Sequence, residues 1–251
     1  MPIIKNIKVI LTAPEGINLI VVKVETDQQG LYGLGCATFA YRELAVKSVV
    51  EDYLRPLLIN RDVQNIEDLW HLMYHNAYWR NDAITNNAIS GIDMALWDIK
   101  GKIAGLPLYD LFGGKSREGV PFYRHVNGNS ILEIIEKIEA LEKQKISHVR
   151  IQWGLYGGIA KTMNYPIGAQ PGTYIDQNQY IQDTIKMFEK VRAHFGYSIE
   201  LIHDVHERIH PMDAIYLAKQ LEKYKLFFLE DPFSPEQIDW IKHLRFQTST
   251  P

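Results

Sequence analysis

The sequence predicts an α/β fold in which a small α+β module precedes a region of alternating strands and helices. Three stretches rich in β-branched residues come first, and helical periodicities follow them to about residue 104. From about residue 120, short apolar runs alternate with helical patterns four times. Strands followed by helices are typical of α+β units, whereas repeated alternation is typical of a parallel sheet. We therefore expect one domain over residues 1–115 and a parallel sheet, in a barrel or a doubly wound fold, over residues 116–251.

The first domain is expected to begin with an antiparallel meander, because short turns separate its β-rich stretches at residues 3–11, 17–25 and 31–37. Three helices are expected next. The first, over residues 44–54, should stop before Pro56, since proline lacks the N–H that a helix interior needs. The second covers 65–77 with Asn65 as N-cap, and the third covers about 85–104 and is apolar on much of its circumference. A glycine-rich linker at 111–119 ends the domain.

In the second region, strands are expected at 120–125, 148–152, 199–203 and 226–230, and helices at 130–144, 179–194, 211–223 and 235–244. The loop 154–178 shows no periodicity, and loops of this length are usually functional or disordered. A barrel needs eight strands, and four are counted here. We expect that the other half lies outside this sequence; the alternative is that another chain covers the apolar edge at 226–229.

Composition narrows the class of protein. The net charge of −3, with Lys and Arg dispersed along the chain, provides no basic field for nucleic acid. The single cysteine, Cys36, excludes an intrachain disulfide and fits a reducing compartment. The N-terminus has no signal-peptide core, and no apolar run is long enough to span a membrane. We expect a soluble, cytoplasmic protein.

Two apolar runs in the second region end abruptly in acidic residues, at Asp204 and at Glu230. They are about one strand-helix-strand unit apart, and parallel α/β folds place their active sites at the C-terminal ends of the strands. Carboxylate oxygens there would suit Mg²⁺, a hard cation. The alternative is that Asp204 caps the next helix and Glu230 pairs with a surface base.

A resemblance to a known family covers essentially all 251 residues. It is carried by short sequence motifs at residues 33–38, 42–44, 77–80, 88–100, 111–114, 203–206 and 229–232. Through them the chain resembles the enolase superfamily. The resemblance is to the mandelate racemase/muconate lactonizing enzyme-like group, in its branch of D-mannonate and D-gluconate dehydratases and starvation-sensing proteins. It implies an α+β capping domain with a modified TIM-type (β/α)7β barrel, of which this chain would hold about the first four strands. It also implies a homo-oligomer.

The resemblance further implies a Mg²⁺-dependent sugar-acid dehydratase, which removes an α-proton and then a β-hydroxyl to leave a 2-keto-3-deoxy sugar acid. Asp204 and Glu230 would be two of three metal ligands, with the third beyond Pro251. His206, two residues past Asp204, would point to the same side of an extended backbone and protonate the departing hydroxyl. Its alternative role is to hold Asp204. His203 is expected to face away from the site.

Two further residues, Arg150 and His125, match the dehydratase branch. Arg150 corresponds to an arginine that works with a tyrosine base, and its alternative role is to bind the substrate carboxylate. Tyr165 is the nearest candidate for this base and Tyr156 the next; the alternative is that each is an ordinary loop tyrosine. His125, expected like Arg150 at a strand end, corresponds to a histidine that contacts substrate, or it is a buried, hydrogen-bonded histidine.

The chain differs from the mannonate dehydratases of this branch in two places that bear on substrate specificity. Ala40 stands where they have an asparagine that contacts the sugar, and the loop 154–178 does not align cleanly with their tyrosine-bearing loop. The alternatives are another reaction of the superfamily, such as racemisation, and a catalytically weak sugar-acid-binding or sensing protein. A third is that this chain alone is inactive because its site is incomplete.

Overall fold

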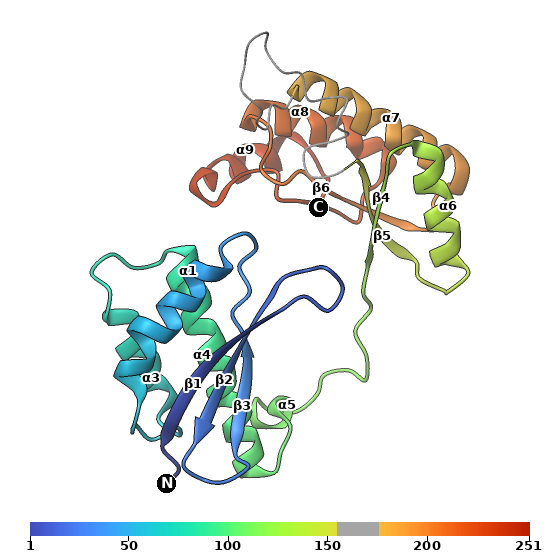
Figure 1. Ribbon diagram of the computed structural model, residues 1–251. Helices are drawn as coiled ribbons and strands as arrows, with labels where there is room; N and C mark the ends of the chain where they lie inside the picture. The colour runs from blue at the N-terminus through green and yellow to red at the C-terminus, as the bar shows by residue number, and fades with distance from the viewer. Residues whose placement is uncertain (155–175) are drawn as a thin grey trace. The chain divides into compact units, whose positions relative to one another are not determined.

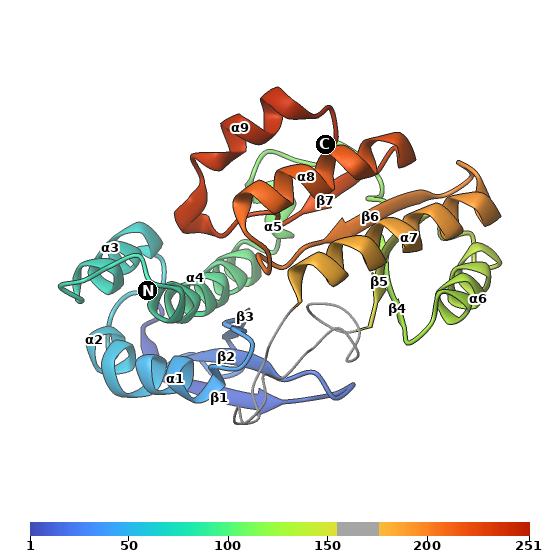
Figure 2. The same ribbon diagram turned by 90° about the horizontal axis from the view of Figure 1, so that it is seen from above.

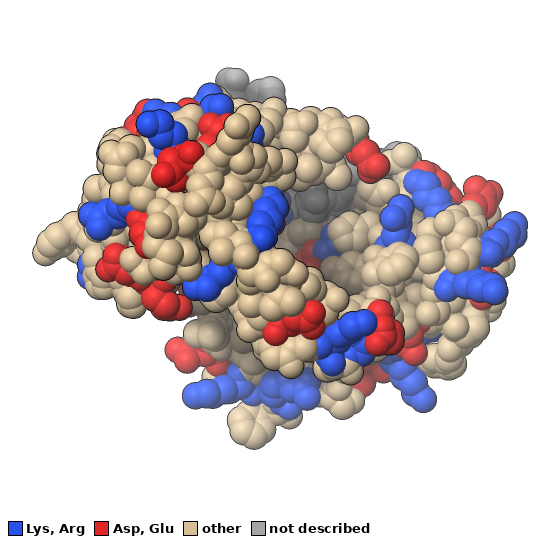
Figure 3. Space-filling model, turned by 90° about the horizontal axis from the view of Figure 1, so that it is seen from below, with Lys and Arg blue, Asp and Glu red and all other residues tan. Residues whose placement is uncertain are grey.

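The computed structural model describes residues 1–154 and 176–251, which form two compact units, Met1–Glu118 and Gly119–Pro251 (Figure 1). Each unit has a hydrophobic core of its own. Acidic and basic side chains are interspersed on the face shown in Figure 3, in keeping with the small net charge. Among the helices of the described residues, none is long and apolar enough to cross a membrane.

The first unit begins with the expected antiparallel meander, which is confirmed. Strands β1 (Ile4–Thr12), β2 (Leu19–Thr26) and β3 (Tyr32–Cys36) pair in the order β1-β2-β3. Side chains alternate between the two faces of a strand, so the fully buried Ile20, Val22 and Val24 share one face of β2 and form part of the core.

The helices of the first unit are α1 (Glu43–Ser48), the π-helical segment η1 (Val49–Leu54), α2 (Arg55–Leu58), α3 (Ile66–His75), α4 (Ala83–Ala104) and α5 (Leu108–Leu111). The expected stop before Pro56 is wrong. The proline occupies the first turn of α2, after the π-helical segment, where its missing N–H is tolerated. Asn65 does occupy the N-cap position of α3, but its side chain makes no capping hydrogen bond.

Helix α4 packs on the sheet so closely that its backbone meets β3. A Cβ placed on Gly33 would lie 1.9 Å from the carbonyl oxygen of Ala95, and one on Gly35 would lie 1.9 Å from that of Gly91. The glycines of β3 are therefore required by this contact. The predicted burial of the helix is confirmed, because Ile92, Leu96 and Ile99 are fully buried.

The second unit is a parallel sheet in the order β4-β5-β6-β7, as expected (Figures 1 and 2). Its elements are β4 (Arg124–Gly128), α6 (Ile131–Glu142), β5 (His148–Trp153), α7 (Gln177–Phe195), β6 (Glu200–Asp204), α8 (Pro211–Leu221), β7 (Phe228–Glu230) and α9 (Trp240–Gln247). Side chains of α6, α7 and α8 form one core with the strands.

Several boundaries differ from the sequence prediction by one to five residues, and three of the elements concerned are β4, β7 and α9. Strand β4 begins at Arg124 instead of residue 120, because the preceding segment contains Pro121 and leaves Val120 and Phe122 exposed. Strand β7 is shorter than expected, and its Leu229 N–H donates to the carbonyl of Pro251 at 2.8 Å. Helix α9 starts later than expected, since Ser234 caps a separate 3-10 turn ahead of it.

The strand register divides the second sheet into two faces. His125 pairs with Arg150, Arg150 with Ile202, and Asp204 with Glu230. Neighbours in register lie on the same face, and residues two apart along a strand do so as well. His125, Arg150, Asp204 and Glu230 therefore share one face. The opposite face carries a buried set that packs in the core with the helices: Val126, Val149, Ile151, Leu201, His203 and Leu229.

Candidate metal centre

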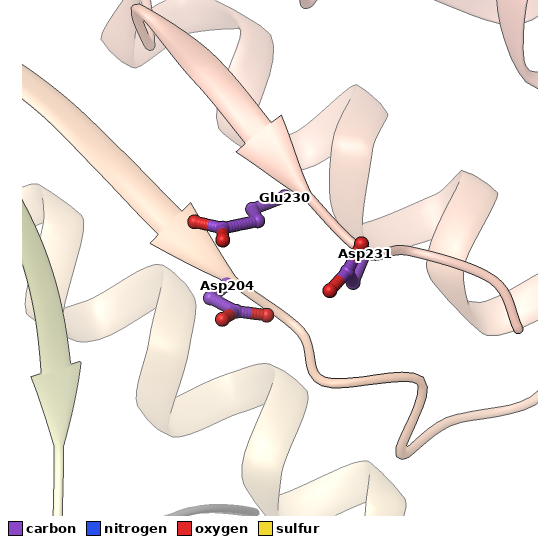
Figure 4. A group of neighbouring side chains, drawn as sticks. All are labelled: Asp204, Glu230 and Asp231. Carbon is purple, nitrogen blue, oxygen red and sulfur yellow. The ribbon is translucent and has the colours of Figure 1, made fainter. Parts of the chain in front are cut away.

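Three carboxylates meet where β6 and β7 end. Asp204 is the last residue of β6, Glu230 is the last of β7, and Asp231 follows it. One oxygen from each lies within 4.8 Å of the others, and Figure 4 shows the three side chains at the ends of these two neighbouring strands. The sequence predicted the positions of Asp204 and Glu230 at strand ends, and the structure confirms those positions.

Asp231 was not among the predicted ligands. Consecutive residues of a strand point to opposite faces, so a carboxylate next to Glu230 is expected to face away from it. Asp231 instead has a φ of 43°, a left-handed conformation that ends the strand alternation and lets both side chains contribute oxygens. The acidic string at residues 230–231 was the only sequence signal for it.

Arg150 links the carboxylates to the rest of this face. Its Nη1 lies 2.5 Å from Asp204 Oδ2 and 3.1 Å from Glu230 Oε2, and its side chain is only 11% exposed. The guanidinium thus offsets part of the negative charge of the cluster. Contrary to expectation, Arg150 is the third residue of β5 and does not end it. Its long side chain reaches the strand ends from that position.

His125 lies beside the same guanidinium, with Nδ1 3.3 Å from Arg150 Nη2. Burial, reinforced by the positive charge of Arg150, lowers the pKa of His125. Arginine only donates hydrogen bonds, so Nδ1 accepts and the proton of the neutral ring is on Nε2. His125 is the second residue of β4 and not its end, because that strand starts and finishes later than the sequence indicated.

His206 contacts Asp204 through a turn. The expected extended backbone is wrong here: β6 ends at Asp204, and His206 has a φ of 53°. Asp204 Oδ1 accepts the His206 backbone N–H at 2.8 Å, which stabilises the turn, and His206 Nε2 lies 2.9 Å from Asp204 Oδ2. Burial would raise the pKa of Asp204, but the hydrogen bonds and charge of His206, with a contribution from Arg150, lower it overall. Asp204 is therefore a carboxylate.

His203 faces the opposite side of the sheet, as expected. It is 1% exposed, with Nδ1 2.9 Å from the carbonyl oxygen of Ile151 and Nε2 2.9 Å from the Tyr180 hydroxyl. The carbonyl accepts, so Nδ1 carries the proton and Nε2 accepts from Tyr180. Burial lowers the pKa of His203 to about 4, so the ring is neutral at pH 7.

The donor set fits a hard divalent cation. Glu230 Oε2 is buried and has no hydrogen-bond partner, because Arg150 Nη1, although 3.1 Å away, does not approach it with hydrogen-bond geometry. A buried anionic oxygen in this state is suited to a cation. Mg²⁺ binds through one or two carboxylates and retains other oxygen ligands, which matches Asp204 and Glu230 with Asp231 beside them. Tyr165 and most of the loop 154–178 lie outside the described residues.

Comparison with known proteins places both units in one family. Residues 2–113 match the mandelate racemase / muconate lactonizing enzyme N-terminal domain, and residues 133–251 match the enolase C-terminal domain-like family. A D-galactonate dehydratase family member of Salmonella virchow is 49% identical over 99% of this chain and 64% of its own length. One from Musicola paradisiaca is 50% identical over 99% of this chain and 64% of its own length. The chain thus spans under two thirds of the length of these curated relatives.

Solved structures agree with this placement. An enolase from Pantoea ananatis, with bound D-gluconate and Mg, matches all of this chain and 65% of its own, with a TM-score of 0.93 and 46% identity. The 3,6-anhydro-D-galactonate cycloisomerase of Zobellia galactanivorans matches 99% of this chain and 64% of its own, with a TM-score of 0.79 and 28% identity. The parallel sheet with carboxylates at its strand ends and the three-stranded N-terminal unit are thus parts of one known architecture. This chain belongs to the enolase superfamily.

Proposed function

We propose that the protein is a Mg²⁺-dependent sugar-acid dehydratase that converts a sugar acid of the gluconate, mannonate or galactonate type to its 2-keto-3-deoxy product. The observation that carries the proposal is the carboxylate cluster of Asp204, Glu230 and Asp231, with Arg150 and His206 in contact with it. The similarity to the gluconate- and Mg-bound Pantoea ananatis enolase and to the D-galactonate dehydratase family members supports it.

Asp204 and Glu230 would hold the metal, with Asp231 as an additional oxygen donor. When bound, Mg²⁺ supplies positive charge next to the substrate carboxylate, where negative charge develops as the α-proton leaves. Arg150 lies against the same two ligands and would orient that carboxylate.

The remaining residues would move protons or hold the sugar chain. Tyr165, working with Arg150, would take the α-proton. The electron pair of that C–H bond forms the new double bond as the β C–O bond breaks, and His206 would protonate the leaving hydroxyl to give water. The enol then becomes the keto acid. His125, neutral and hydrogen-bonded to Arg150, would contact a substrate hydroxyl.

His206 has a second candidate role, which its contact with Asp204 favours. Because Nε2 lies 2.9 Å from Asp204 Oδ2, His206 would orient this ligand instead of protonating the leaving group. His206→Asn separates the two roles. Loss of kcat with unchanged Mg²⁺ affinity indicates the proton donor, whereas weakened Mg²⁺ binding indicates the orienting role.

The experiment that tests the function is to incubate the purified protein with Mg²⁺ and a panel of sugar acids, and to assay for 2-keto-3-deoxy product. We expect product from at least one C6 sugar acid and none after metal removal. Exchange of the α-proton with deuterated water, without dehydration, would instead indicate racemisation. Binding without either reaction would indicate a sensing protein, and in both cases the dehydratase proposal is wrong.

A further inference from the structure

Gln152, the next-to-last residue of β5, has a buried amide with no partner. The residue is 8% exposed, and its Nε2 makes no hydrogen bond. Buried donors are nearly always paired, because an unpaired one loses its bonds to water without replacement. Among the described residues, the only other side-chain atom in this state is Glu230 Oε2, in the metal centre.

The strand pattern directs Gln152 to the face that carries the metal centre. It follows Arg150 by two residues, so the two side chains lie on the same face of β5. Arg150 is in register with Ile202, and continuing that register by two residues brings Gln152 level with Asp204. Adjacent strands are about 4.8 Å apart, so the amide lies one strand from the carboxylates. Asn127, its register partner on β4, continues this row away from them.

The chemistry of the amide selects a neutral partner. A carboxylate of the substrate is expected at the metal and Arg150, where the positive charge is located. The carbon chain bound to that carboxylate carries hydroxyl groups, each of which accepts and donates hydrogen bonds, and an amide side chain can do the same. Gln152 lies on β5, between Asp204 on β6 and Asn127 on β4. A sugar chain that extends from the metal across β5 toward β4 would therefore pass over its amide.

We propose that Gln152 donates from Nε2 to a hydroxyl oxygen of the sugar-acid chain and so helps to determine which sugar acid binds. This inference rests on the proposed function of the same site. A buried polar group that is paired only by the right substrate discriminates strongly, because an analogue without that hydroxyl leaves the group unpaired.

The test is to combine Gln152→Met with substrate analogues that lack, one at a time, each hydroxyl beyond the β-carbon. Binding to the Mg²⁺-loaded protein is measured by calorimetry. For the parent sugar acid we expect the Kd of Gln152→Met to be about tenfold higher than that of the wild type. For one analogue the two proteins should bind equally. Mg²⁺ affinity should not change, since Gln152 is not a ligand. The matched control is Gln144→Met, at an exposed glutamine of the same unit, which should bind like the wild type.

Thermal unfolding of the ligand-free protein gives a readout that is independent of activity. Because methionine removes an unpaired amide and has a similar volume, Gln152→Met should have a Tm at or above that of the wild type. A lowered Tm would indicate that Gln152 has a structural partner and would overturn the inference. Equal weakening for every analogue, or no weakening, would overturn it as well while leaving the dehydratase proposal intact. If the wild type neither binds nor converts any sugar acid, both are wrong.

Discussion

Glu230→Gln removes one negative charge from the cluster of Asp204, Glu230 and Asp231 and keeps the size of the side chain. The substitution tests the metal centre directly, because Glu230 Oε2 is the buried oxygen without a hydrogen-bond partner. It also removes the ion pair with Arg150, whose guanidinium retains its contact with Asp204 at 2.5 Å. The main expected effect is therefore on cation binding and not on folding.

The magnitude follows from the charge that is lost. Two unit charges about 4 Å apart interact with about 1 kcal/mol in bulk water, so a divalent cation and one carboxylate interact with about 2 kcal/mol. The Glu230 side chain is 27% exposed, and water screens it less than a surface group. A loss of about 2 kcal/mol is therefore a lower bound, and we expect the Kd for Mg²⁺ to rise at least about thirtyfold.

Calorimetric titration of Mg²⁺ into the metal-free protein measures this change. The control is Glu236→Gln, which removes the same charge from an exposed position in the turn that follows β7. It should change the Kd less than about threefold, because exposed charges are screened by water and salt. Equal effects of the two substitutions would show that general charge, and not this cluster, governs binding. A wild-type affinity in Glu230→Gln would refute the assignment of Glu230.

Of three further predictions, two concern the two cores and the third concerns ion pairs on the surface of the first sheet. Arg192→Met removes a buried guanidinium that donates to four backbone carbonyls, so it should cost about 3–5 kcal/mol in urea unfolding; a cost below about 1 kcal/mol would contradict this. Gly35→Ala would place a Cβ 1.9 Å from the carbonyl of Gly91, so it should cost about 3 kcal/mol or more in the same assay, and an unchanged midpoint would show that β3 and α4 can separate. Hydrogen bonds from Lys8 and Lys23 lower the pKa of Glu25 to about 2. The ionised Glu25 carboxylate stabilises the folded protein by less than about 1 kcal/mol, because it is a surface group. This stabilisation is present above the ordinary pKa of Glu25 and is lost as pH falls from about 4.5 to about 2. The difference in Tm between the wild type and Glu25→Gln should disappear over that range, and a difference that persists at pH 2 would contradict it.

Periodicity and local composition were sufficient to predict the kinds and order of the strands and of the longer helices, but not of the short helical segments such as α5. The alternation of apolar runs with helical patterns predicted the parallel sheet, and abrupt acidic ends to those runs located Asp204 and Glu230. These signals are local: each depends on residues that are close together in the chain. The family resemblance then assigned roles to the residues, and those roles remain proposals.

What the sequence did not predict depends on backbone conformation and on contacts between distant residues. The left-handed φ at Asp231 brings its carboxylate beside those of Glu230 and Asp204, whereas an alternating strand would direct it to the opposite face. His206 lies next to Asp204 as the sequence predicted, but it does so through a left-handed turn and not through an extended backbone. Residues 120–123 resemble a strand in composition but find no partner in the sheet. The continuation of the helix through Pro56 depends on a π-helical segment, for which no local pattern was evident.

His203 and Asp204 are consecutive residues of β6, and their side chains lie on opposite faces of the sheet in opposite electrostatic environments. On one side of β6 an imidazole is neutral between Tyr180 and the Ile151 carbonyl; on the other a carboxylate is ionised beside Arg150 and His206. Insertion or deletion of one residue within β6 would exchange these two side chains. An ionised acid would then face the packed helices, and an uncharged ring would face the metal centre. The number of residues in β6 therefore matters to the site as much as the identity of its side chains does.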